Sequence, residues 1–210
     1  MTTTRDHIVQ AADTLFHEQG FEHTSFATIA EAVQISRGNF YYHFKSKDEI
    51  LDAVIAARLE RTRAMLAQWE ADSATPQDCL YAFIEMLVRN QTSIMRHGCP
   101  VGTLCNELAR LGHEAQEGAN AILDLFREWL REQFVRMGHG KNADALAMHL
   151  LARSQGVATL ALALRDRAFV LREVDQMRAW VASCAPAGAT ATAAAAPRRR
   201  ALSSSSKGRK

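Results

Sequence analysis

The sequence predicts an all-α protein of about nine helices, and three observations support this fold class. Apolar residues recur every three or four positions through most of the chain, which is the spacing of one face of a helix. Only four prolines occur in 210 residues. Serines stand just before several of the periodic stretches, where their hydroxyls can cap a helix N-terminus. These serines are Ser25, Ser36 and Ser46.

Three helices are expected in the first 45 or so residues. The first carries Ile8 and Phe16 on its apolar face and ends at Gly20, which favours the left-handed backbone of a helix end. Ser25 and Ser36 cap two shorter helices that meet across a two-residue turn. The expected ranges are about 4–19, 26–33 and 37–43.

The remaining helices are expected to form a larger region. Ser46 and Glu49 make a capping box at the start of a long helix, because each side chain can accept a hydrogen bond from the backbone amide of the other. Pro76 stands in the first turn of the next helix, where its missing amide hydrogen costs nothing, and Gly98 ends that helix. The expected ranges are about 47–71 and 76–97, a short helix after Pro100, and then 114–137, 143–165 and 170–183.

The helix expected at 143–165 is apolar over nearly its whole circumference between Val157 and Leu164. Such a helix has to be covered on every side. Ala152 and Gly156, four residues apart, would let a second helix approach closely, so we assign the last two helices to a subunit interface. The alternative is a central core helix within one chain.

Charge is distributed unevenly along the chain. The net charge is +2, but residues 186–210 hold six basic side chains and no acidic one, so the rest of the chain carries −4. This terminal segment has little to bury and is expected to be a disordered basic tail. The tail either adds salt-sensitive affinity for phosphate or only keeps the chain in solution. Any nucleic-acid contact by the acidic body must come from a local set of side chains.

Composition and spacing exclude several classes of protein. No apolar run reaches the roughly 18 residues of a membrane span and the N-terminus does not resemble a signal peptide, so we expect a soluble, cytoplasmic protein without a membrane partner. The four cysteines form no CxxC pair and are expected to be free thiols, and no zinc-site spacing is present. Cys99 with His97 is the only nucleophile–base pair close in sequence, and it lacks a third orienting group. We therefore expect no metal, no cofactor and no enzyme.

Residues 24–49 combine two short helices with many polar side chains. In a helix-turn-helix the second helix lies in the major groove and reads base edges, while flanking groups hold phosphates. Arg37 can bind guanine and Asn39 adenine, each through two hydrogen bonds, and Gly38 lets the backbone approach the groove. Phosphate contacts are expected from Thr24, Ser25, Tyr41, Tyr42, His43 and Lys47. Alternatively these are solvated turn residues, with one of the tyrosines packed on the first helix.

The run Gly38-Asn-Phe-Tyr-Tyr-His-Phe-Lys-Ser-Lys47 closely resembles the DNA-binding signature of the TetR family of bacterial repressors. The resemblance is detailed over about residues 5–55, and elsewhere it lies in helix number and order. It implies a head that binds half of an inverted repeat, a dimer formed by the last two helices, and a ligand cavity inside helices four to eight. It implies DNA contacts from Thr24, Ser25, Ser36, Arg37, Gly38, Tyr41, His43 and Lys47, with Asn39 and Tyr42 at variable positions that help to set the operator.

The expected organisation is a helix-turn-helix DNA-binding domain at 1–46, a ligand-binding and dimerisation domain at 47–185 and the basic tail at 186–210. The expected function is a dimeric repressor that a small-molecule inducer, such as an electrophile or oxidant, releases from a palindromic operator. The alternative is an activator of the same fold, or a regulator controlled by a protein partner. Many family members carry several basic residues before the first helix, whereas this chain has only Arg5, so DNA affinity is either modest or supplemented by the tail.

The stretch from His97 to Glu107 is similar to a segment of one TetR branch that includes electrophile and redox sensors. Cys99 directly precedes an expected helix start, where the helix dipole favours a thiolate. Cys105 could pair with Cys99 only if the helix start moved. Alternatively, both are small buried apolar groups.

Three more residues are candidates for ligand binding. Trp129 stands at helical spacing among large apolar residues, which are ordinary core or line a pocket. His149 and Arg153 lie one helical turn apart and could bind an anionic ligand. The alternative for this pair is polar packing at an interface.

Overall fold

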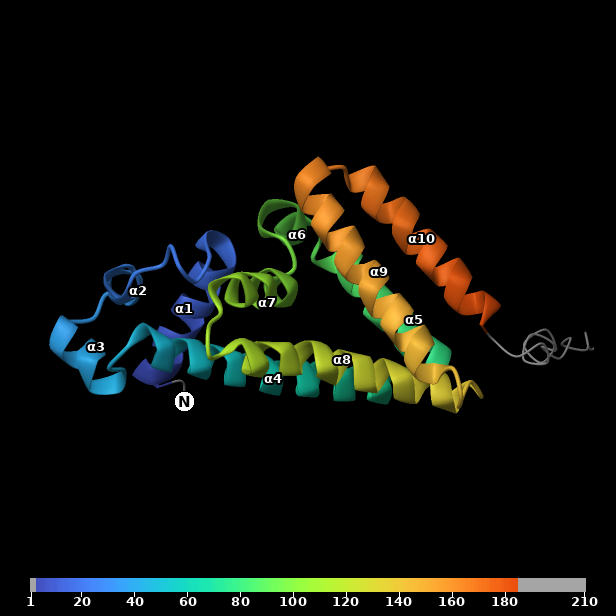
Figure 1. The fold of residues 1–210 in the computed structure, drawn as a ribbon, viewed down its shortest axis with the longest axis horizontal. Coiled ribbons are helices and arrows are strands. Elements are labelled where there is room, and N and C mark those ends of the chain that lie inside the picture. Colours follow the sequence, from blue (N-terminus) through green and yellow to red (C-terminus); the bar gives the residue numbers. More distant parts are fainter. Residues whose placement is uncertain (1–2, 185–210) are drawn as a thin grey trace, which may run out of the picture.

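The computed structural model describes residues 3–184, and every regular element in that range is a helix (Figure 1). The all-α fold class is confirmed, and the tail expected at 186–210 lies outside the described residues. No helix in this range is long and apolar enough to cross a membrane. The elements are α1 (Thr4–Gln19), α2 (Phe26–Val33), α3 (Arg37–His43), α4 (Lys47–Asp72), α5 (Pro76–Arg89), α6 (Gln91–His97), α7 (Pro100–Leu111), α8 (Gln116–Arg136), α9 (Ala143–Leu164) and α10 (Arg167–Ser183).

The one helix predicted at 76–97 is two helices, α5 and α6, so residues 3–184 contain ten helices. They separate at Asn90, whose backbone angles of φ −101° and ψ 8° leave the helical region. Asparagine favours such positions because its side chain competes with the helical hydrogen bonds. The apolar spacing conceals the break, since Leu87 before it and Ile94 after it are both buried and are seven residues apart.

The helix caps predicted from the sequence are present at Ser25, Ser36 and Ser46. The capping box at the start of α4 is only half formed. Ser46 accepts a hydrogen bond from the amide of Glu49 at 3.1 Å, but the Glu49 carboxylate accepts from the amide of Lys45 at 2.7 Å. The carboxylate therefore holds the chain one residue before the cap, which fixes the connection between α3 and α4.

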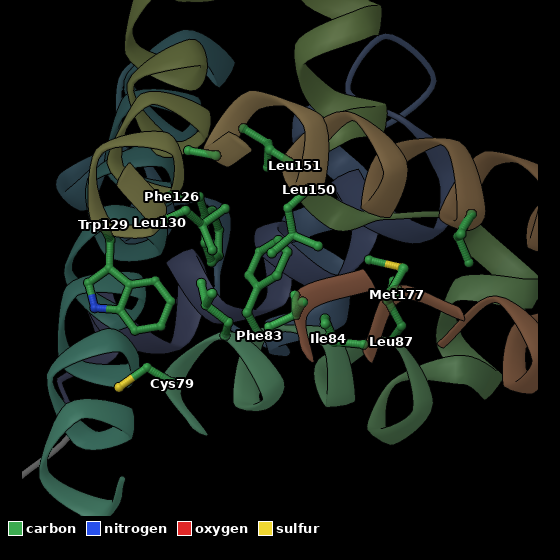
Figure 2. Close-up of a cluster of buried hydrophobic side chains, with 14 of the residues drawn as sticks. Cys79, Phe83, Ile84, Leu87, Phe126, Trp129, Leu130, Leu150, Leu151 and Met177 are labelled. Atoms are coloured by element: carbon green, nitrogen blue, oxygen red, sulfur yellow. The ribbon is translucent and has the colours of Figure 1, made fainter. Parts of the chain in front are cut away.

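The buried apolar side chains form two clusters. One lies among α1, α2, α3 and the start of α4, and it also receives Leu104 and Leu108 from α7. The other fills the space among α5, α8, α9 and α10, and Figure 2 shows Phe83, Leu150 and Met177 pointing into it. In Figure 1 the long helices α4 and α8 run between the two ends of the molecule. The small helices α6 and α7 both contact α1; α7 contributes Leu104 and Leu108 to the first cluster, and α6 contributes Ile94 to the second.

Candidate DNA-binding site and ligand cavity

The helices α1, α2 and α3 form the head, and α3 is anchored in it by two phenylalanines one turn apart. Phe40 and Phe44 are 1% and 2% exposed, and the ring of Phe40 meets that of Phe26 on α2 edge-on at 4.5 Å. Side chains one turn apart share a face, so the other face of α3 is left to the solvent. That exposed face carries Asn39 and Tyr42, and Tyr42 is 78% exposed. The structure thus supplies a short helix with a buried anchor and an exposed polar face.

The two capping serines remain at the surface of the head. The hydroxyl of Ser25 accepts from the amide of Thr28 at 3.0 Å, and that of Ser36 accepts from the amide of Asn39 at 3.3 Å. A hydroxyl that accepts an amide hydrogen keeps its own proton for another acceptor. Ser36 can therefore cap its helix and still donate to a phosphate oxygen. The Oγ of Ser25 also lies 2.7 Å from Oγ1 of Thr28, so Ser25 can donate to a phosphate when Thr28 is the donor of that contact.

The aromatic run of α3 is divided between packing and exposure. The ring of Tyr41 lies 5.0 Å from that of Phe26 and is tilted against it, yet Tyr41 remains 51% exposed. His43 is half-buried, and its ring is edge-on to Tyr42 at 5.2 Å. Tyr41 therefore packs on α2. The alternative interpretation of the sequence had one of the two tyrosines packed on the first helix. Gly38 is exposed, with open space where a side chain would stand, so the backbone of α3 is accessible there.

Thr24 was expected to contact phosphate, but its side chain does not reach the surface and this prediction is wrong. Thr24 is completely buried, and its hydroxyl donates to the carbonyl of Gly20 at 2.7 Å. Lys47 is also engaged within the head, because its Nζ donates to the carbonyl of Phe21 at 2.9 Å and lies 4.0 Å from the centre of the Phe21 ring. Both side chains hold the turn between α1 and α2. The sequence could not show this, because both contacts depend on the fold of that turn.

A cavity of about 530 Å³ lies between the head and the helices that follow it. Its apolar wall comes from α4 to α9 and includes the ring pair Phe83–Phe126, whose centres are 5.7 Å apart. Its polar wall comes from α1 and α4. The side chains of this polar wall are Asp13, Thr14, His17, Glu18, Arg58, Arg61 and Thr62. Helix α1 of the head therefore forms part of the cavity wall.

The polar wall is closed by an ion pair between α1 and α4. Arg58 donates from Nε to Oδ1 of Asp13 at 2.6 Å, and Arg61 contacts the other oxygen of the same carboxylate. Arg58 also donates to the carbonyl of Pro100, at the start of α7. His17 faces the carbonyl of Gly98 at 3.0 Å, and burial lowers the pKa of its imidazole. The neutral ring is thus the stable form in the wall.

The four cysteines are free thiols, as predicted, and two of them have different surroundings near the cavity. Cys99 lines the cavity and caps α7, with its Sγ accepting from the amide of Gly102 at 3.5 Å. Cys105 is buried in the core of the head, and burial raises the pKa of its thiol to about 11. The raised pKa disfavours the thiolate form of Cys105, and its role in sensing stays a prediction. Cys99 lies at the start of α7, as the sequence predicted, and its reactivity stays a prediction.

The other three ligand candidates lie outside the cavity lining. Trp129 is 7% exposed in the core cluster of Figure 2, and its ring lies 5.8 Å from that of Trp69. His149 is exposed and lies against Trp180, with ring centres 4.6 Å apart. Arg153 pairs with Glu173 at 2.9 Å between α9 and α10. Neither His149 nor Arg153 lines this cavity, and Arg153 takes part in polar packing between α9 and α10; binding of an anionic ligand by the pair stays a prediction.

Sequence reasoning missed the polar residues of the cavity wall. Arg58 occupies the buried register of α4, one turn after Val54 and one turn before Thr62, and all three are buried. A charged residue at such a position needs a buried partner. A charged residue in the buried register of a helix could therefore have identified Arg58 from the sequence. Its partner Asp13 lies 45 residues away and could not be predicted from spacing.

An exposed polar helix at one end of the all-helical range 3–184, with a cavity behind it, is the arrangement of a helix-turn-helix regulator. Comparison with known families agrees. Residues 8–54 match the profile of bacterial regulatory proteins of the tetR family. Residues 76–177 match that of the C-terminal domain of LmrA/YxaF-like transcriptional regulators. The chain belongs to the TetR family of transcriptional regulators.

Individual relatives agree with this assignment. The chain is 27% identical over 194 residues to the regulator TtgR of Pseudomonas putida, a match that covers 85% of this chain and 88% of TtgR. It is 31% identical over 80 residues to IcaR of Staphylococcus aureus, a negative regulator of a biofilm operon, covering 38% of this chain and 43% of IcaR. A TetR regulator from Legionella pneumophila has the same fold, with a TM-score of 0.77 at 22% identity over 89% of this chain and 99% of that one.

Proposed function

We propose that this protein is a dimeric, cytoplasmic repressor that binds an inverted-repeat operator and leaves it when a small molecule fills the cavity. The observation that carries this proposal is the shared wall of the cavity. Asp13 and His17 of the head line it together with Leu151 and Ser154 of α9. A ligand would therefore touch the head and the C-terminal helices at once. An equilibrium between two states shifts when a ligand binds them unequally.

The DNA contacts in this proposal come from α3 and its flanks. Arg37 and Asn39, at the start of α3, would read base edges, and Tyr42 would help to set the sequence preference. Phosphates would be held by Ser25, Ser36, Tyr41 and His43, with the backbone at Gly38 close to the groove. In a dimer, the two copies of α3 would enter successive major grooves about 34 to 36 Å apart.

The dimer in this proposal forms through α9 and α10. Both helices bury one face within the chain and leave apolar side chains on the other, among them Leu160 at 47%, Leu164 at 60% and Leu171 at 39% exposure. Gly156 has open space around it, so a second helix can approach α9 there. A second copy would cover these side chains and complete the burial that the sequence of α9 indicates.

The cavity favours an uncharged and mostly apolar ligand. The ionised side chains of its wall, Asp13, Glu18, Arg58 and Arg61, carry equal numbers of positive and negative charges. A charged ligand would leave one charge without a partner, which is costly in a low-dielectric site. The uncharged polar side chains of the lining are Thr14, Thr62, Asn90, Ser93, Ser154 and Gln155. Cys99 in the same wall offers a thiol to an electrophilic ligand.

The proposal is tested by selecting genomic fragments with the purified protein and measuring affinity for the recovered site by fluorescence anisotropy. Neutral aromatic, anionic and electrophilic compounds are then added. We expect a palindromic site, bound by a dimer, and release by the neutral compounds. If only electrophiles release the protein from the operator, and Cys99→Ser is no longer released by them, the sensor acts through a covalent bond to Cys99. Failure to recover any specific site would overturn the proposed function.

A further inference from the structure

We propose that Glu107 of α7 positions the DNA-binding head by holding the turn between α1 and α2, and that it carries movement of the cavity wall to that turn. The positioning role rests on the contacts of Glu107 alone. The transmission role rests also on the proposed function, because it needs a ligand in the cavity. The two roles are therefore tested separately below.

The Glu107 carboxylate binds two consecutive backbone amides of the turn. Its Oε2 accepts from the amide of Phe21 and its Oε1 from the amide of Glu22, both at 2.9 Å. The contact is close, since a Cβ at Gly20 would lie 3.0 Å from Oε1. Gly20 also has a φ of +90°, which glycine adopts without strain. Hydrogen bonds from amides to a carboxylate are stronger than those to a neutral acceptor.

The same turn is held from its other side by α4. The amide of Phe21 donates to Glu107, while its carbonyl accepts from Nζ of Lys47 at 2.9 Å. The Phe21 ring is buried and meets His113, just after α7, edge-on at 5.0 Å. Two opposite charges from two helices thus fix one peptide segment. Because α2 begins at Phe26, a few residues later, the direction of α2 and α3 depends on this segment.

The other end of α7 belongs to the cavity. Cys99, Pro100 and Val101 line it, and Glu107 lies about two turns further along the same helix, roughly 10 Å away. On the side of α9, Gln155 lines the cavity and packs so closely on Gly102 that a side chain there would collide with it. A ligand that displaces this wall moves the start of α7. A helix transmits such a displacement as a unit, so the carboxylate of Glu107 shifts against the turn.

The positioning role is tested with Glu107→Gln in the full chain. Glutamine keeps the length but loses the charge, and its amide nitrogen cannot accept a hydrogen bond. We expect the Phe21 and Glu22 amides to exchange with deuterium about tenfold faster than in the parent protein, while amides inside α1 are unchanged. Operator affinity without ligand should fall about tenfold. The control is Glu117→Gln, an exposed glutamate in the first turn of α8, which should change neither quantity.

Unchanged exchange at Phe21 and Glu22 in Glu107→Gln, or an unchanged operator affinity, would overturn the positioning role. If this variant does not fold, Glu107→Asp takes its place. The aspartate keeps the charge on a shorter side chain, so the same two quantities should move in the same direction.

Transmission is tested with the neutral fluorescent probe N-phenylnaphthylamine. Its fluorescence reports occupancy of the cavity. Saturation with the probe should speed deuterium exchange of the Phe21 and Glu22 amides in the parent protein. In Glu107→Gln, where these amides already exchange faster, the probe should cause no further increase. Bound probe with unchanged exchange in the parent would overturn the transmission role. Absence of probe binding would instead count against the ligand class proposed above, and the Glu107→Gln measurements would still decide the positioning role.

Discussion

Arg58 and Asp13 form a buried ion pair that joins α4 to α1 in the wall of the cavity. Their Nε and Oδ1 atoms are 2.6 Å apart, and the side chain of Arg58 is only 6% exposed. The same guanidinium reaches the carbonyl of Pro100, at the start of α7. One arginine therefore ties together the head, the long helix α4 and the helix that carries Glu107.

We predict that Asp13→Ala lowers the free energy of unfolding by about 3 kcal/mol. The substitution leaves the Arg58 charge buried without its carboxylate, and removing one partner of a buried pair costs roughly 3 to 5 kcal/mol. Urea denaturation followed by circular dichroism measures the change. The matched control is Arg63→Ala, whose side chain is 58% exposed and faces Glu60 at 3.7 Å. Its effect should stay below about 0.5 kcal/mol. Equal effects of the two substitutions would contradict a buried role for Arg58.

The buried position of Thr24 leads to a second prediction about stability. Thr24→Val keeps the shape but removes the hydroxyl that donates to Gly20, so the free energy of unfolding should fall by about 1 to 2 kcal/mol. Thr92→Val, at an exposed position on α6, should change it by less than about 0.5 kcal/mol. Denaturant titrations of both variants make the comparison. If Thr24→Val were as neutral as Thr92→Val, the hydrogen bond from Thr24 to Gly20 would not stabilise the head.

The helices could be predicted from the sequence because their signals are local. Apolar spacing and capping residues such as Ser25 and Ser36 act within one or two turns, and the structure forms the helices where these signals stand. The break between α5 and α6 at Asn90 was missed because the apolar spacing continues across it from Leu87 to Ile94. Only the backbone angles of Asn90 reveal the break. Local signals therefore determine the fold class but not every helix end.

The contacts of the cavity wall and of the turn between α1 and α2 could not be predicted because their partners are distant in sequence. The Glu107 carboxylate meets the amide of Phe21 across 86 residues, and Arg58 meets Asp13 across 45. No spacing rule relates residues so far apart. The position of Cys99 before a helix start could be predicted from the sequence, whereas the burial of Cys105, which raises the pKa of its thiol, is a tertiary property that spacing does not reveal.

Acid should weaken the protein through His17. Burial lowers the pKa of this imidazole below its ordinary 6.5, so the folded state favours the neutral ring and protonation favours the unfolded chain. Stability contributed by the neutral ring is complete above about pH 6.5 and is lost as the pH falls through the lowered pKa. We predict that the loss of unfolding free energy between about pH 7.5 and about pH 5 is smaller in His17→Gln than in the parent. An equal loss in both would show that His17 titrates normally.

The cysteines should differ in their reaction with iodoacetamide at about pH 8. A thiol with a pKa of about 11 is ionised to roughly one part in a thousand at that pH, so Cys105 should remain unlabelled in the folded protein. Cys99, half-buried in the cavity wall, should be labelled first, and saturation with N-phenylnaphthylamine should slow its labelling. Mass spectrometry of peptides follows each site, and all cysteines should react in urea. Equal rates at Cys99 and Cys105 would contradict the different burial of the two thiols.

The proposed dimer can be tested at Leu160, which is 47% exposed on the outer face of α9. Leu160→Glu would place two carboxylates, one from each subunit, in an apolar contact, where an unpaired buried charge is strongly unfavourable. We predict that this variant sediments as a monomer at micromolar concentration and binds the operator more weakly, because each half-site is then bound separately.

The control for Leu160→Glu is Leu111→Glu, at the end of α7, where the leucine is 41% exposed but lies away from α9 and α10. It should remain dimeric and keep its operator affinity. The opposite pattern, a monomeric Leu111→Glu with a dimeric Leu160→Glu, would move the interface to α7. The exposed leucines of α9 and α10 would then need another partner, because such a patch is rarely left uncovered in a monomer.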